Sequence, residues 1–462
     1  MTEQRRGLVD LGFETIGNAT LICHDRKPVL VTDPWLGGDV YFGSWTFSHH
    51  IPQEQLDAIT GAEYAWVSHG HPDHLSLRGL RKLRAKRILL SDHVGGRIAS
   101  ILKEKGWDVA VLRDRTWYTL SDRIRVLSIS DYNQDGVLLV DLDGRLLVNL
   151  NDASDRGWGG FVRSVIRRYP VSILMRLSGF GDADMINIFD EEGRRIPPPA
   201  AKREPVGKQI AGMTREFGAT HFLPFSSMHR YQRADSIWAD EYTTRLSDYL
   251  VGFDSTTSTL LPAFIRYDRR TEQFEEIHPP ERQAKVRHPE EFGDDWSDEL
   301  GAEDFRKVSE YFRSISHLER HFKFINLRVG GRDNVITLAN RKFDRGITFE
   351  VPRTSLMHAV SLDILDDLLI GNFMKTILHG KTSPGGLYPH FTPYVAKYAD
   401  SGGARTKEEL RQYFLAYLRR APFEFLRDQL ERRSRDVVRS VLQTDSGLYR
   451  MTRRAYHLIK GW

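Results

Sequence analysis

Four side chains that can ligate metal ions lie within six residues of one loop. They are His69, His71, Asp73 and His74, in the sequence SHGHPDHLS at 68–76. Residues 62–68 predict a strand, and residues two apart in extended backbone point the same way. His69 and His71 can therefore converge on one cation, while Asp73 and His74 follow on a turn and face a second. Imidazole and carboxylate without thiolate suit Zn, Fe or Mn, and two such ions can activate water or O2.

Strands and helices surround this loop in an order that indicates two stacked sheets. Residues 8–35 predict paired strands, and the DG at 143–144 predicts a hairpin within a strand-rich stretch. Apolar periodicity predicts helices at 77–87, 96–107, 158–170 and 208–218. A block of strands with helices on both sides predicts an α/β fold of the αββα sandwich type.

The chain divides into three parts by composition. Residues 1–265 predict the metal-binding catalytic domain. Residues 266–302 are polar, acidic and contain proline, which predicts a connector. Residues 303–462 predict a mixed α/β and then helical C-terminal domain, in which 355–378 indicate buried helix.

Composition excludes several classes of protein. With 462 residues, 40% of them apolar and 28% charged, the chain is globular rather than disordered. The single cysteine, Cys23, excludes an internal disulfide framework, a zinc ribbon and a Rieske cluster built from this sequence alone. A net charge of +4 is too weak to predict a nucleic-acid partner. Without a long apolar run or a signal-like start, we expect no membrane contact and a cytoplasmic location.

The spacing HxHxDH is the signature of the metallo-β-lactamase superfamily, which the chain resembles at further places. The similar segments are 30–38 (LVTDPWLGG), 146–154 (LLVNLNDAS) and 221–229 (HFLPFSSMH). The resemblance implies that Asp152 bridges the two metals and that His229 is a further ligand. It also implies that Asp33 orients a ligand rather than binding metal.

Within the superfamily, the chain is most similar to the catalytic domain of the CMP-N-acetylneuraminate hydroxylase family. The similarity includes TDPWLGGDVYFGSW and ILMRLSGFGDA, and continues more weakly through LDDLLIGNFMKTILHG. That family carries a Rieske domain, so an oxygenase with this sequence needs an external electron donor. The superfamily also has a third histidine after the strand IRVLSIS, where this chain has DYNQDG. Asp131 or Asn133 are the candidate substitutes, and an oxygen ligand favours Fe or Mn over Zn.

Three activities are compatible with these residues. The favoured one is a dinuclear iron oxygenase that oxidises a polar or anionic metabolite, with a nucleotide-sugar as one candidate. The second is a Zn or Mn hydrolase of a lactone, thioester, amide or phosphoester, in which Asp73 orients a metal-bound hydroxide. The third is a non-catalytic binding relative. Four basic residues are weaker candidates for holding an anionic substrate: Arg176, Lys208, Arg230 and Arg233.

Overall fold

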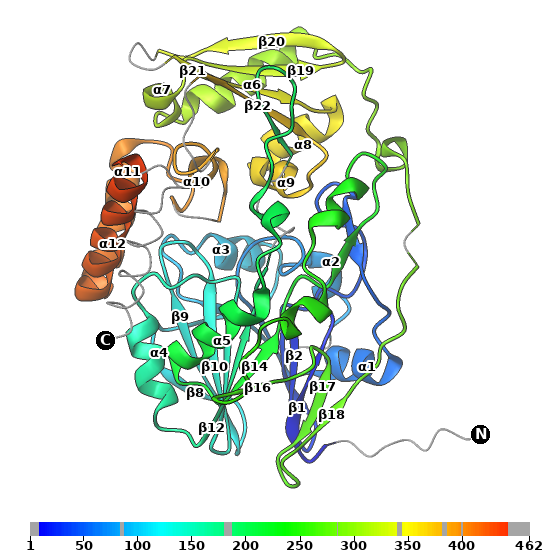
Figure 1. Cartoon of the computed structure of the whole chain (residues 1–462), viewed down its shortest axis with the longest axis vertical. Helices are drawn as coiled ribbons and strands as arrows, with labels where there is room; N and C mark the ends of the chain where they lie inside the picture. The colour runs from blue at the N-terminus through cyan, green and yellow to red at the C-terminus, as the bar shows by residue number, and fades with distance from the viewer. Residues whose placement is uncertain are drawn as a thin grey trace.

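The computed structural model describes residues 9–83, 87–179, 187–283, 285–339, 344–380, 386–398 and 401–441. Two stacked sheets form one end of the molecule, and a third sheet with its helices lies at the other end (Figure 1).

The first sheet has eight strands, antiparallel on one side and parallel on the other. Their order is β18 (Gln273–Glu276), β17 (Ile265–Asp268), β1 (Leu11–Ile16), β2 (Thr20–Asp25), β3 (Pro28–Thr32), β5 (Tyr64–Val67), β6 (Arg87–Ser91) and β7 (Val109–Leu112). From β3 to β7 the pairing is parallel. The carboxyl ends of these parallel strands therefore share one edge, where ligand-binding loops gather.

The second sheet has seven strands and is arranged in the same way. Their order is β16 (Thr259–Leu260), β14 (His221–Pro224), β12 (Val171–Arg176), β11 (Arg145–Asn151), β10 (Gly136–Leu142), β9 (Ile124–Ser130) and β8 (Trp117–Thr119). The predicted hairpin joins β10 to β11, and Asp143 and Gly144 both have positive φ, as a tight two-residue turn requires. The parallel strands β11, β12 and β14 end at one edge.

Apolar side chains fill the space between the sheets and beneath the outer helices. Phe13, Trp66 and Leu138 are fully buried between the sheets. The helices α1 (Gln53–Gly61) and α3 (Arg97–Glu104) pack on the first sheet, and α4 (Gly159–Ile166) and α5 (Val206–Phe217) on the second. The predicted αββα sandwich is confirmed.

The C-terminal part is built on a five-stranded sheet. Its order is β13 (Ile188–Phe189), β22 (Lys375–Gly380), β21 (Arg345–Glu350), β19 (Phe324–Val329) and β20 (Arg332–Thr337). Its helices are α6 (Ala302–Ser314), α7 (Leu318–His321), α8 (Arg353–Leu362), α9 (Leu365–Ile370) and α10 (Thr392–Val395). Its core also takes in Trp35, Tyr41 and Trp45 from the segment between β3 and α1, so the two parts share apolar contacts. The last two helices, α11 (Lys407–Arg420) and α12 (Pro422–Val441), follow this part in the chain, and α11 packs on the sandwich, where Tyr413 and Tyr417 contact Tyr132.

Several elements differ from those expected. The first sheet extends past residue 265, because β17 pairs with β1 and β18 pairs with β17. Residues 355–378 are not one helix: Asp363 ends α8 in the left-handed conformation, and the chain then forms α9 and enters β22. The helix expected at 77–87 is the short α2 (Leu77–Leu80), with 84–86 outside the described residues. The three-part domain division stays a prediction.

A two-stranded ribbon joins β4 (Trp45–Phe47) to β15 (His229–Tyr231).

Among the described helices, none combines the length and the apolar character needed to cross a bilayer.

Candidate metal centre

The motif loop leaves β5 at the edge where the parallel strands end, as its sequence predicts. Asp33, which follows β3, fixes the start of this loop, because its Oδ1 accepts a hydrogen bond of 2.8 Å from the Ser68 N–H. The Asn151 side chain, at the end of β11, donates to Asp33 Oδ2 at 2.8 Å and to Ser68 Oγ at 2.9 Å. The two sheets are thus joined by buried hydrogen bonds beneath the loop.

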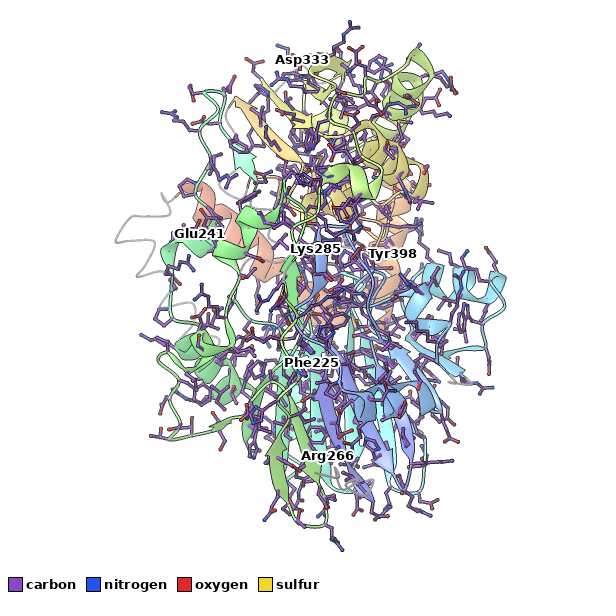
Figure 2. The ribbon with its side chains drawn as sticks, turned by 90° about the vertical axis from the view of Figure 1, so that its right-hand side faces the viewer. Phe225, Glu241, Arg266, Lys285, Asp333 and Tyr398 are labelled. Atoms are coloured by element: carbon purple, nitrogen blue, oxygen red, sulfur yellow. The ribbon has the colours of Figure 1, made fainter. Side chains whose placement is uncertain are left out.

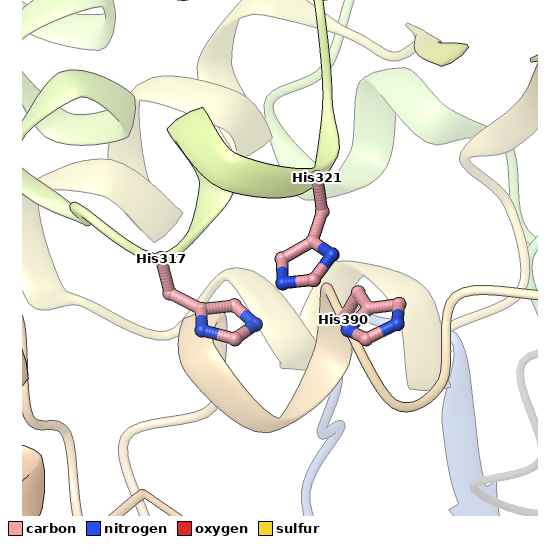
Figure 3. Close-up of side chains that lie close together, drawn as sticks. All are labelled: His317, His321 and His390. Atoms are coloured by element: carbon pink, nitrogen blue, oxygen red, sulfur yellow. The ribbon is translucent and has the colours of Figure 1, made fainter. Parts of the chain in front are cut away.

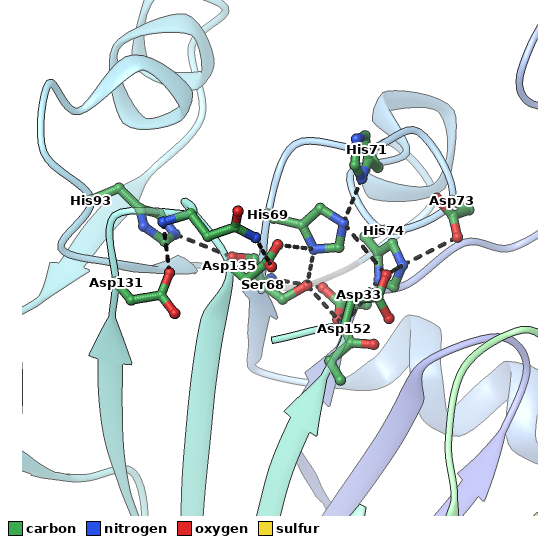
Figure 4. Close-up of polar contacts among 12 residues, drawn as sticks. Asp33, Ser68, His69, His71, Asp73, His74, His93, Asp131, Asp135 and Asp152 are labelled. Carbon is green, nitrogen blue, oxygen red and sulfur yellow. Dashed lines mark hydrogen bonds and ion pairs between the residues drawn. The ribbon is translucent and has the colours of Figure 1, made fainter. Parts of the chain in front are cut away.

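His69, His74 and Asp152 form the first ligand set. One potential ligand atom from each lies within 4.8 Å of the others. The Nε2 atom of His74 lies 3.5 Å from Asp152 Oδ2, and that of His69 lies 3.9 Å from the same oxygen (Figure 4). Both imidazoles are buried and the Asp152 side chain is 26% exposed, so this set is open to solvent at the carboxylate.

Asp73 and Asp33 hold His74 at opposite ends of its ring. Asp33 Oδ2 lies 3.3 Å from Nδ1, and Asp73 Oδ2 lies 3.1 Å from Nε2. Asp73 itself accepts hydrogen bonds from the Tyr41 hydroxyl at 2.5 Å and from the Asn18 amide at 2.9 Å. Such outer contacts fix the orientation of a ligand ring.

A second ligand set was missed by the sequence analysis. His71 does not share the first set but lies with Asp366 and Asp367 of α9, again with ligand atoms within 4.8 Å of one another. Its Nε2 is 3.2 Å from Asp366 Oδ2, and its Nδ1 is 2.9 Å from His69 Nε2, so the two sets adjoin. The available signal was the adjacent aspartates in the apolar run DILDDLLIG, because unpaired carboxylates are rarely buried.

The buried carboxylates of this cluster concentrate negative charge, which bound cations would neutralise. Burial raises the pKa of Asp367, and the nearby charge of Asp366 raises it further. Burial lowers the pKa of His71, but the hydrogen bond and charge of Asp366 outweigh this and raise it to about 9. In the absence of metal, a proton on His71 thus offsets part of the negative charge.

Buried atoms without hydrogen-bond partners fit the same interpretation. Among the described residues, Asp152 Oδ1 and Asp366 Oδ1 are buried and have none. Burying a carboxylate oxygen is costly unless it is paired or coordinates a metal. The donor set, which contains imidazoles and carboxylates only, therefore fits two divalent ions such as Fe, Mn or Zn.

The structure brings His229 near the cluster but into neither ligand set. Its ring is buried and stacks on Trp45, with centroids 3.5 Å apart. Burial lowers the pKa of His229 to about 3, and the charge of Asp73 acts against this shift. Its role as a ligand stays a prediction.

The expected substitutes for the third histidine point elsewhere. Asp131 accepts a hydrogen bond from the Trp158 indole at 3.1 Å, and the Asn133 amide oxygen accepts from Arg156 at 3.1 Å. Asp135, at the end of the same segment, lies 3.9 Å from His69 Nδ1 instead. Burial and the charge of Asp152 raise the pKa of Asp135 to about 6.

The four basic candidates differ in their surroundings. Arg233 is fully buried between Asp235 and Asp294, at 2.9 and 2.8 Å, so it is not available to a substrate, contrary to expectation. Lys208 is exposed on α5, and Arg230 is 39% exposed beside Glu281. Arg176 ends β12 next to Asn151, and the charge of Asp152 acts on it.

No family model matches the chain. It is 27% identical to the cytidine monophosphate-N-acetylneuraminic acid hydroxylase of Danio rerio over 157 residues, which cover 32% of this chain and 26% of that protein. It is also 27% identical to the Macaca mulatta hydroxylase over 184 residues, covering 37% and 30%. The alignments thus span less than a third of the length of either relative.

Solved structures give weaker matches. CmlA, a diiron β-hydroxylase from Streptomyces venezuelae, is 13% identical, with coverage of 59% of this chain and 55% of that chain and a TM-score of 0.36. A putative metal-dependent hydrolase from Parabacteroides distasonis is 14% identical, covers 55% and 92%, and has a TM-score of 0.32. Similarity at this level does not bear on the activity of the chain.

Proposed function

We propose that this metal-dependent enzyme with the metallo-β-lactamase fold is a dinuclear non-haem iron oxygenase that hydroxylates or otherwise oxidises a polar, anionic metabolite. The observation that carries the proposal is the donor set, in which the carboxylates of Asp152, Asp366 and Asp367 accompany the motif histidines without a thiolate. Oxygen-rich sites favour iron or manganese over zinc. The sequence similarity to hydroxylases that act on a nucleotide-sugar supports the reaction class.

Each ligand set would hold one ion. His69, His74 and Asp152 would hold the first, and His71, Asp366 and Asp367 the second. Two bound irons supply the reduction of O2 and the oxidation of the substrate.

The chain's own residues prepare the two sets. Asp33 accepts at Nδ1 of His74, so Nε2, which lies 3.1 Å from Asp73 Oδ2, would be the ligand atom toward the first ion. Tyr41 and Asn18 donate hydrogen bonds to the Asp73 carboxylate and so restrict its rotation. Arg176 is the candidate to bind the anionic group of the substrate, because it ends β12 beside β11, the strand that leads to Asp152.

Electrons would come from a separate protein or from the substrate. Cys23 is buried within the sheet and is the single cysteine of the sequence, so these residues alone hold no cysteine-ligated cluster.

Metal content and oxygen consumption test the proposal. Protein purified without oxygen and reconstituted with Fe(II) is expected to bind two irons per chain and to consume O2 with a reductant and an anionic metabolite panel. Asp366→Asn is expected to retain one iron, because it removes a charge from one ligand set only, whereas the exposed Asp57→Asn should retain two. Binding of zinc but no iron would overturn the oxygenase.

A hydrolase on the same donors is the second candidate. Asp135 lies 3.9 Å from His69 outside both ligand sets, where a carboxylate can take a proton from an attacking water. Turnover of a lactone, thioester or phosphoester without O2 or reductant, lost in Asp135→Asn, would establish this activity instead.

A further inference from the structure

We propose that His317, His321 and His390 form a separate binding site for a transition-metal ion, with zinc as the expected occupant. This site lies in the C-terminal part and shares no residue with the candidate metal centre, so it does not depend on the proposed oxygenase.

Two of the three histidines come from one helical turn. His317 directly precedes α7 and has helical backbone angles, and His321 is the last residue of α7. Residues four apart on a helix lie on the same face. His390 comes from a distant segment that leads into α10, and all three rings lie together between these elements (Figure 3).

The distances suit a shared ion. One ring nitrogen from each histidine lies within 4.8 Å of the others. Nitrogen ligands about 2.0–2.1 Å from a tetrahedral zinc are about 3.4 Å apart, so the rings must turn out of their stacked arrangement and bring these nitrogens closer together to bind one ion. The Nε2 atom of His317 is buried and has no hydrogen-bond partner, which leaves it available for an ion.

The rings are packed face to face in the absence of metal. His321 stacks on His390 with centroids 3.8 Å apart, and His317 stacks on Tyr394 at 3.5 Å. Burial and the charges of the neighbouring groups lower the pKa of His317 to about 3 and that of His321 to about 4.

The composition of the site selects the ion. Three imidazoles without a carboxylate suit Zn, Cu or Ni rather than Mg, Ca or Mn. The three side chains are half-buried, so solvent can reach a fourth position. Arg320 and Arg345 add positive charge nearby, which opposes a bare cation and favours an anion such as hydroxide or chloride as the fourth ligand.

Zinc binding to the full chain tests the site. Equilibrium dialysis against Zn²⁺ is expected to show one equivalent fewer in His321→Gln and in His390→Gln, because loss of one of three ligands weakens binding by more than about 100-fold. The matched control is His278→Gln, whose side chain is 79% exposed and lies outside the site. It should bind as much zinc as the unmodified chain.

Thermal unfolding separates a lost ligand from a damaged fold. In EDTA the variants should unfold at the same temperature as the unmodified chain, and added Zn²⁺ should raise Tm less in the two variants. Wild-type zinc stoichiometry in both variants would overturn the site. His74→Ala, which disables the candidate metal centre, should keep the equivalent held by the three histidines, so failure of one proposal is distinguishable from failure of the other.

Discussion

His74 is held by protein contacts at both ring nitrogens, and this makes Asp33 a positioning residue. Asp33 lies 3.3 Å from Nδ1 and is fully buried. We expect Asp33→Asn to weaken metal binding by about 10–100-fold, because the ring loses its carboxylate partner while the fold is kept. Titration of the apo-protein with Fe(II) measures this. Asp141→Asn, which changes another buried carboxylate in β10, should bind iron normally. Equal affinity in Asp33→Asn would remove the positioning role.

The motif residues and their surroundings differ in how far sequence could predict them. The loop at His69 follows a strand directly, so local periodicity was enough to place it at a sheet edge. Asp366 lies 295 residues after His71 in the chain, and its approach to His71 depends on how α9 packs. Asp135 rather than Asp131 faces His69 because Asp131 is held by the Trp158 indole, a contact that no local pattern reveals.

At the scale of elements, β17 is fixed to the first sheet by a buried ion pair as well as by its ladder. Glu14 of β1 accepts a hydrogen bond of 2.6 Å from Arg266 of β17 and lies 3.2 Å from His24 of β2. Figure 2 shows Arg266 toward the end of the sandwich remote from the C-terminal part. Residue 265 is therefore the first residue of a sheet strand. The polar composition of the residues after it predicted a connector and gave no sign of this strand.

This ion pair predicts how stability depends on pH. Burial raises the pKa of Glu14, but His24 and Arg266 outweigh it and lower the pKa from 4.5 to about 2. Because the pKa of Glu14 is lower in the folded state, its ionised carboxylate adds about 3 kcal/mol to the free energy of unfolding above pH 4.5. This contribution is lost as the pH falls from 4.5 through about 2. Urea unfolding of Glu14→Gln should show lower stability at pH 7 and a shallower decline over that interval. A wild-type pH profile in this variant would contradict the assignment.

At the scale of the whole molecule, the candidate centre lies where the sandwich meets the C-terminal part. Arg233 helps to join them, with its guanidinium 2.8 Å from Asp294 and stacked 3.9 Å from the ring centroid of Phe373. Tyr398, which belongs to the same described segment 386–398 as His390, lies near the middle of the molecule (Figure 2). This segment is fixed to both parts, because Arg97 of α3 donates to the Lys397 carbonyl and the Lys397 ammonium donates to the Leu362 carbonyl.

Tyr398 covers the motif loop at a glycine, and this contact couples the C-terminal part to metal binding. A Cβ atom at Gly70 would lie 2.2 Å from the Tyr398 ring, so Gly70→Ala must displace either the ring or the loop beside His71. We expect this variant to fold but to lose most of the second ion, since His71 would move away from Asp366. Iron content per chain measures the loss, and hydrogen exchange of 386–398 reports release of the segment. Gly61→Ala is the matched control, because nothing lies within 4 Å of a Cβ there. Two irons and unchanged exchange in Gly70→Ala would show that the C-terminal part does not act on the centre through Tyr398.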